Sequence, residues 1–228
     1  MAGPAKGPGK AGKGQGMRLV AEGVGGERGG EIVFSGIDFA VSDGEALVVT
    51  GPNGSGKSTL LRIIAGLLPT AEGSIRLEGG GEEAPDPAAV CHYLGHENGM
   101  KPALSVAENL DFWQSFHGRP ALGINEALEA VSLETVAHLP YGYLSTGQRR
   151  RIAIARLLIN HRPLWLLDEP TAGLDRRSED RFAALMGGHL REGGMIVAAT
   201  HVALGLDAVK ELKMGERPPV RQGEGLSC

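Results

Sequence analysis

The sequence predicts an α/β fold with a parallel sheet that is covered on both faces. Three observations predict it. Short apolar segments alternate with segments of helical periodicity along the chain. A glycine-rich loop leads directly from one apolar segment into a helix, as in a strand–loop–helix unit. Residues 95–160 are expected to be mostly helical, so we expect them to form an insertion into the sheet framework.

In the first half of the chain, short apolar segments separated by glycine and Asp-Gly turns predict strands. A helix follows the glycine-rich loop, with apolar residues at helical spacing, and Pro69 ends it. The expected strands span residues 19–21, 32–34, 37–41, 46–50, 74–77 and 89–94, and the helix spans residues 57–68.

In the second half, Ser105 followed by Glu108 forms a capping box, which predicts a helix that continues to Gly118. Two further helices are expected over residues 125–137 and 146–160. Apolar segments then return at residues 164–167 and 195–200, with a helix at about 176–191 between them. We expect these segments to be buried parallel strands, the second being the final strand.

Residues 1–16 consist almost wholly of Gly, Ala, Pro and Lys, so we expect a disordered head followed by one domain over residues 17–228. The head is either solvated or in contact with an anionic membrane surface. No apolar run approaches the roughly 18 residues of a transmembrane helix, and no secretory signal follows the basic head. The two cysteines, Cys91 and Cys228, are expected to be free thiols in a reducing cytosol. A net charge of −4 does not favour nucleic-acid binding.

The loop after the strand at 46–50 fits the pattern G-x-x-x-x-G-K-[ST]. Its glycines allow backbone N–H groups to converge on phosphate oxygens, and the following helix adds the positive end of its dipole. Lys57 is suited to the β- and γ-phosphates, and the Ser58 hydroxyl is suited to Mg²⁺. The sequence therefore predicts binding of ATP and Mg²⁺ by Gly51, Pro52, Asn53, Gly54, Ser55, Gly56, Lys57, Ser58 and Thr59.

Two carboxylates, Asp168 and Glu169, end the apolar strand at 164–167. Adjacent residues on a strand point to opposite faces, so we expect the two acids to have different tasks. Asp168 is suited to the Mg²⁺ shell, and Glu169 is suited to polarising the attacking water. Taken alone, such a pair could also cap a helix; the phosphate loop upstream favours catalysis.

The segment Leu144-Ser-Thr-Gly-Gln148 resembles the LSGGQ signature of ATP-binding-cassette (ABC) ATPases. The phosphate loop, this signature, the Asp-Glu strand end, Ala172-Gly-Leu-Asp175 and His201 occur in the order typical of that family. The resemblance implies a mixed, mainly parallel sheet with an antiparallel β subdomain and an inserted helical subdomain. It also implies a head-to-tail dimer with a second copy, in which Ser145, Gly147 and Gln148 face the partner's ATP. His201 would hold the γ-phosphate and orient water, and Asp175 would contact the partner.

Besides Thr146, which replaces the first glycine of the signature, two positions depart from the family pattern. Glu97 aligns best with a glutamine that normally contacts Mg²⁺ and the membrane partner. It either contacts the metal or has a coupling or surface role. Arg28 lies where the family places an aromatic ring under adenine. A guanidinium can stack on a base, so Arg28 either stacks on adenine or is a solvated loop residue.

Several local strings, including Tyr93-Leu-Gly-His96 and Pro163-Leu-Trp-Leu-Leu-Asp-Glu169, resemble one branch of the family. This branch contains the ATP-binding subunits of haem exporters that serve c-type cytochrome biogenesis. The resemblance implies integral membrane partner subunits and a peripheral location on the cytoplasmic face of the bacterial inner membrane. The alternatives are the ATPase of an exporter for another substrate, or a soluble ABC ATPase without a transport role.

Overall fold

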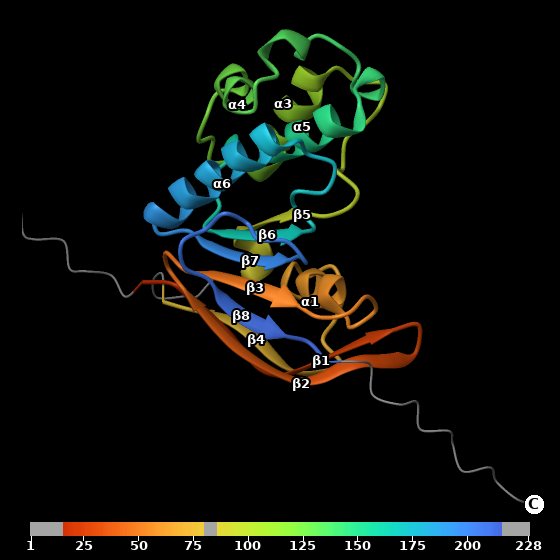
Figure 1. The fold of residues 1–228 in the computed structure, drawn as a ribbon, viewed down its shortest axis with the longest axis vertical. Helices are drawn as coiled ribbons and strands as arrows, with labels where there is room; N and C mark the ends of the chain where they lie inside the picture. Colours follow the sequence, from red (N-terminus) through yellow and green to blue (C-terminus); the bar gives the residue numbers. More distant parts are fainter. Residues whose placement is uncertain (1–15, 80–85, 216–228) are drawn as a thin grey trace, which may run out of the picture.

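In the computed structural model, residues 16–79 and 86–215 are described. The predictions for the N-terminal head up to residue 15 and for Cys228 concern residues outside these ranges. Within the described part, the strands form an antiparallel sheet of three strands and a parallel sheet of five. The parallel sheet lies between the antiparallel sheet and a layer of helices (Figure 1). No helix in these ranges is long and apolar enough to cross a bilayer.

The antiparallel sheet has the order β2-β1-β4 and forms the lower layer in Figure 1. It contains β1 (Arg18–Arg28), β2 (Glu31–Ser42) and β4 (Glu72–Glu78). The two strands expected at 32–34 and 37–41 are one continuous strand, because β2 pairs with β1 over its whole length. The register of this pairing shifts near Gly23 and Gly36, which both have positive φ values. The antiparallel sheet implied by the family resemblance is therefore present.

The parallel sheet has the order β5-β6-β7-β3-β8. Its strands are β3 (Ala46–Thr50), β5 (Cys91–Leu94), β6 (Leu164–Asp168), β7 (Met195–Ala199) and β8 (Lys210–Lys213). Every residue of β6 and β7 is buried. This burial matches the continuous apolar runs in the sequence, because parallel strands are covered on both faces.

Side chains alternate between two cores on the two faces of the parallel sheet. On one face, Val49 and Leu166 pack with α1 (Lys57–Ile64) and the antiparallel sheet. On the other face, Leu167 and Ile196 pack against the helical layer. This layer contains α3 (Val106–His117), α4 (Ile124–Ala130), α5 (Thr146–Leu158) and α6 (Arg176–Arg191), together with the 3₁₀ turns η1 (Glu134–Val136) and η2 (Tyr141–Tyr143).

Several predicted boundaries are wrong. Residues 89–90 belong to a short helix, α2 (Pro87–Val90), because Asp86 caps it and a proline occupies its first position. The helix expected over 125–137 breaks after α4, where Ser132 has a φ of 55°. The helices expected to end at residues 68 and 160 end at Ile64 and Leu158.

The strand at 195–199 is not the final one. The charged segment Lys210–Lys213 follows it and forms β8, an edge strand parallel to β3. Its sequence, KELK, has no apolar run, and its strand conformation comes from backbone pairing with β3.

Candidate functional site

The predicted phosphate loop lies between β3 and α1. Gly51, Gly54 and Gly56 have φ values of 140°, 85° and 97°, which residues with a side chain rarely adopt. Lys57 is buried, and its Nζ donates to the carbonyl oxygens of Gly51 at 2.7 Å and Pro52 at 3.1 Å. The loop thus curls around the ammonium group at the start of α1, so a positive charge and free helix N–H groups are available to phosphate oxygens.

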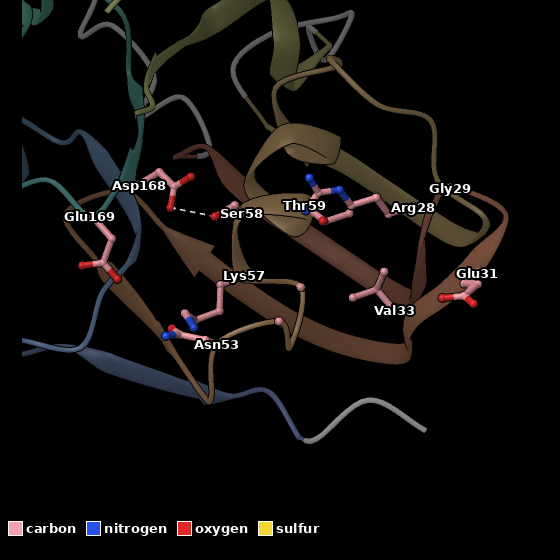
Figure 2. A pocket seen from close by; sticks show the side chains of 12 residues that line it. Arg28, Gly29, Glu31, Val33, Asn53, Lys57, Ser58, Thr59, Asp168 and Glu169 are labelled. Carbon is pink, nitrogen blue, oxygen red and sulfur yellow. Dashed lines mark hydrogen bonds between the residues drawn. The ribbon is translucent and has the colours of Figure 1, made fainter. Parts of the chain in front are cut away.

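A cavity of about 600 Å³ opens over this loop. Figure 2 shows its two sides: Arg28 comes from the β1–β2 hairpin, Asp168 and Glu169 come from the end of β6, and Lys57 and Ser58 lie between them. Segments far apart in the sequence therefore line one volume. The lining consists of Arg28, Gly29, Glu31, Val33, Asn53, Gly54, Gly56, Lys57, Ser58, Thr59, Asp168 and Glu169.

Asp168 contacts two other elements through its carboxylate. Ser58 Oγ donates to Asp168 Oδ1 at 3.0 Å, and the Tyr93 hydroxyl donates to Asp168 Oδ2 at 3.4 Å (Figure 2 shows the first bond). Burial raises the pKa of the Tyr93 hydroxyl, so it remains a donor. A serine hydroxyl beside a carboxylate is an oxygen pair that suits Mg²⁺, which completes its shell with phosphate oxygens and water. The residues present therefore fit the expected metal.

Glu169 lies beyond the end of β6, although the sequence predicted that it would lie on the strand next to Asp168. Its φ is 43°, so the chain leaves the strand at this residue. Thr200 Oγ1 donates to Glu169 Oε2 at 3.3 Å, and His201 Nε2 lies 3.9 Å from Glu169 Oε1. The two acids still project differently, but a turn of the backbone causes the difference.

The signature residues begin α5. Ser145 caps the helix, its Oγ accepting from the Gln148 N–H, and the Gln148 side chain accepts from the Ser145 N–H at 2.9 Å. Gly147 packs so closely on the following loop that a Cβ there would lie 3.2 Å from the Gly173 carbonyl oxygen. Ser145, Gly147 and Gln148 are not among the described residues that line the cavity.

Glu97 and His201 are exposed, and neither belongs to the described lining. Glu97 lies on the loop between β5 and α3. Its charge contributes to the raised pKa of Arg62, although the hydrogen bond between Arg62 and Tyr93 is the main cause. The structure therefore brings together Arg28, the phosphate loop and the two acids, with His201 beside Glu169, and places Glu97 and the signature residues elsewhere.

Three residues that contact this site are absent from the sequence-based predictions: Tyr93, Arg150 and Thr200. Arg150 belongs to the run of three arginines after the signature, which was visible in the sequence. The run does not reveal which arginine points inward. Tyr93 and Thr200 lie at the carboxyl ends of parallel strands, where ligand-binding groups gather. This position in the sequence could have indicated that both residues lie near the site.

Comparison with known proteins adds independent observations. Residues 34–172 match the family model described as ABC transporter. The chain is 69% identical over 199 residues to a cytochrome c biogenesis ATP-binding export protein, CcmA, of Mesorhizobium japonicum, covering 87% of this chain and 98% of the relative. It is 65% identical over 191 residues to the protein of the same name from Brucella abortus (strain 2308), covering 84% and 88% of the two chains.

Two solved structures share the fold. A putative ABC transporter ATP-binding protein of Pyrococcus furiosus superposes with a TM-score of 0.74 at 23% identity, covering 86% of this chain and 97% of the other. A dimeric bacterial ABC transporter cassette superposes with a TM-score of 0.73 at 27% identity, covering 87% and 96%.

Proposed function

Since this chain belongs to the ABC transporter ATP-binding family, and within it to the cytochrome c biogenesis ATP-binding export proteins, we propose haem as the exported species. The chain is an ABC-type ATPase that serves export for cytochrome c biogenesis. The observation that carries the proposal is the near full-length identity of 69% to such a protein. The cavity that joins the phosphate loop to Asp168 and Glu169 supplies the matching chemistry.

In the proposed reaction, Glu169 is the general base that polarises the attacking water. Its carboxylate lies at the cavity wall, and Thr200 orients one of its oxygens at 3.3 Å. His201, 3.9 Å from the other oxygen, would hold the γ-phosphate and orient the water. Lys57 would exchange its bonds to the Gly51 and Pro52 carbonyls for bonds to the β- and γ-phosphates.

Ser58 and Asp168 would hold Mg²⁺, which supplies charge neutralisation of the phosphates when it is bound. The 3.0 Å bond between these two residues supports this role. Arg28 would stack on adenine, because it lines the same cavity as the phosphate loop at the side of the β1–β2 hairpin (Figure 2). For Glu97, its exposure outside the cavity lining favours a coupling or surface role over direct contact with the metal.

The proposed active form is a head-to-tail dimer with a second copy of this chain. Ser145, Gly147 and Gln148 form a helix N-terminus that is not part of the described cavity lining of their own copy. A similar cassette with 27% identity is dimeric. We propose that each signature helix faces the γ-phosphate held by the partner's phosphate loop, so that one copy alone has an incomplete site.

Integral membrane subunits of the exporter are the further proposed partners, at the cytoplasmic face of the bacterial inner membrane. The α3 helix offers them an aromatic face. Phe112 and Phe116 stack with ring centroids 6.0 Å apart, and their exposed fractions are 53% and 69%. Large aromatic side chains exposed together are typical of protein interaction sites.

Affinity purification from membranes of the native host tests the function. The bait is the Glu169→Gln variant with ATP added, and Phe112→Ser/Phe116→Ser serves as the comparison bait. We expect integral membrane proteins of c-type cytochrome biogenesis with the first bait and much less of them with the second. A host lacking this chain should lose c-type cytochromes. Normal c-type cytochromes in that host, or membrane partners of an unrelated transport system, would refute the proposal.

A further inference from the structure

Arg150 is a buried arginine in the second turn of α5, with 7% of its surface exposed. Its guanidinium donates to four backbone carbonyls, which follow or end two neighbouring strands. Nη1 bonds to the oxygen of Gly95 at 2.8 Å, on the loop after β5. Nε and Nη2 bond to the end of β6 and the loop after it, at the carbonyl oxygens of Pro170 (3.0 Å), Asp168 (3.0 Å) and Glu169 (2.6 Å).

The neighbouring arginines have different targets. Arg149 donates to the Gly142 carbonyl at 2.6 Å, before the signature, and Arg151 donates to the carbonyls of Val131 and Ser132, both at 3.2 Å. All three side chains therefore bond to backbone oxygens, but the hydrogen bonds of Arg149 and Arg151 go to carbonyls away from the loop that contains Glu169. This difference makes the neighbours natural controls.

Burial of a guanidinium is costly, and it lowers the pKa of Arg150, while the charges of Asp168 and Glu169 act in the opposite direction. The four carbonyl bonds offset this cost. A planar guanidinium can donate in several fixed directions at once, whereas a lysine ammonium at the same place is a shorter chain ending in one compact charge. The site therefore specifies arginine.

Glu169 needs such support, because its left-handed φ of 43° is unfavourable for a residue with a side chain. The Ala199 carbonyl accepts from its N–H at 2.8 Å, and Arg150 Nη2 donates to its carbonyl. We propose that Arg150 is a positioning residue that holds the Glu169 backbone in this conformation. It thereby keeps the loop after β6, here called the catalytic loop, in a fixed position relative to the end of α5 that carries the signature. The inference rests on the proposed role of Glu169 as general base.

Arg150→Lys, with Arg151→Lys as the matched control, tests this inference. The measurements are kcat and KM for ATP, the ATP dissociation constant and the thermal midpoint. In Arg150→Lys we expect kcat to fall at least about tenfold, because a small displacement of a catalytic group is costly. ATP affinity should stay within about twofold, because the hydrogen bonds of Arg150 go to the segments after β5 and at the end of β6 and not to Lys57 or its loop. Arg151→Lys should retain a kcat close to that of the wild type.

A double variant separates positioning from general loss of structure. If Arg150 acts through Glu169, Arg150→Lys should not lower further the residual turnover of Glu169→Gln. An unchanged kcat in Arg150→Lys, or an additional drop in the double variant, would overturn the inference. Arg150→Gln, which keeps an amide donor, is the second variant if lysine prevents folding, with the same expected loss of kcat.

The two proposals fail in different ways. Glu169→Gln with wild-type turnover would refute the general-base role itself. An inactive Glu169→Gln beside a fully active Arg150→Lys would refute only the positioning role of Arg150.

Discussion

Ser58 Oγ donates a hydrogen bond to Asp168 Oδ1 at 3.0 Å, although 110 residues separate the two in the chain. Ser58 lies in the first turn of α1, and Asp168 ends β6. The bond therefore connects two segments that line the same cavity, the start of α1 and the end of β6. It also places a hydroxyl and a carboxylate oxygen together, as the proposed Mg²⁺ contact requires.

Replacing the carboxylate tests that contact. Asp168→Asn keeps the size of the side chain and removes its charge, so we expect the Mg²⁺ concentration for half-maximal ATPase activity to rise about tenfold or more. A magnesium titration at saturating ATP measures it, and removal of Mg²⁺ by a chelator should abolish wild-type turnover. Asp180→Asn, which removes an exposed carboxylate on α6, is the control. Equal Mg²⁺ dependence in Asp168→Asn and wild type would contradict the assignment.

Glu169→Gln should bind ATP with nearly wild-type affinity and lose turnover by on the order of 10²–10⁴-fold, because the amide cannot accept a proton from water. Size-exclusion chromatography with ATP should then show an accumulated dimer, since nucleotide stays trapped between two copies. Lys57→Ala should instead lose ATP affinity. Retention of turnover by Glu169→Gln would count against the general base.

Arg28→Ala distinguishes stacking on adenine from a loop role. A stacked guanidinium contributes about 0.5–1 kcal/mol at an exposed site, so ATP affinity should fall roughly two- to fivefold. Affinity for inorganic triphosphate should not change, because it has no base. Arg18→Ala, at the other end of β1, is the control. An unchanged affinity for ATP in Arg28→Ala would make Arg28 a loop residue only.

Substitution by alanine should lower the free energy of unfolding by different amounts at two glycines of the phosphate loop. At Gly51 an added Cβ would overlap the Met214 carbonyl after β8, whereas at Gly54 no atom of the described chain lies within 4 Å of the added Cβ. Both have positive φ values, so Gly54→Ala measures backbone strain, about 1–2 kcal/mol. Gly51→Ala should lower the free energy of unfolding by about 1–3 kcal/mol more. Denaturant titrations of both variants measure this difference, and equal losses would argue against the overlap.

Stability should fall as the pH drops below 6.5. Desolvation lowers the pKa of His92 to about 3, and Asn160 accepts a bond from its ring at 3.1 Å. Between pH 6.5 and about 3 the unfolded chain therefore binds more protons at this residue, and the folded state loses up to about 1.4 kcal/mol per pH unit. Urea titrations between pH 7 and 5 measure the slope.

His92→Gln should flatten that slope, while the exposed His96→Gln should leave it unchanged. The slope will not vanish, because burial also lowers the pKa of both His117 and His189 to about 4. A slope equal to that of the wild type in His92→Gln would show that His92 does not remain neutral in the folded protein.

The local elements that the sequence predicts well are those with strong local signals. The bounds 46–50 are those of β3, because both neighbours in the sequence are turns. The capping box at Ser105 and Glu108 begins α3 as expected. The motif order correctly predicts the family, because phosphate binding requires glycine, lysine and hydroxyl groups at a fixed spacing.

Other features depend on contacts that local patterns do not carry. β8 is a strand because β3 offers its edge to a charged segment. Glu169 turns out of β6 because Arg150 and Ala199 bind its backbone from other elements.

By itself, the sequence determined the phosphate loop, the acidic strand end, the signature helix and their order, since each is a short pattern with its own chemistry. Only the tertiary structure decided that Arg28 shares a cavity with Lys57, that Glu97 lies outside it, and that one of three consecutive arginines reaches the catalytic loop. These choices depend on which strands are neighbours in the sheet and on which face of α5 is buried. Both are set by packing over the whole domain, not by local sequence.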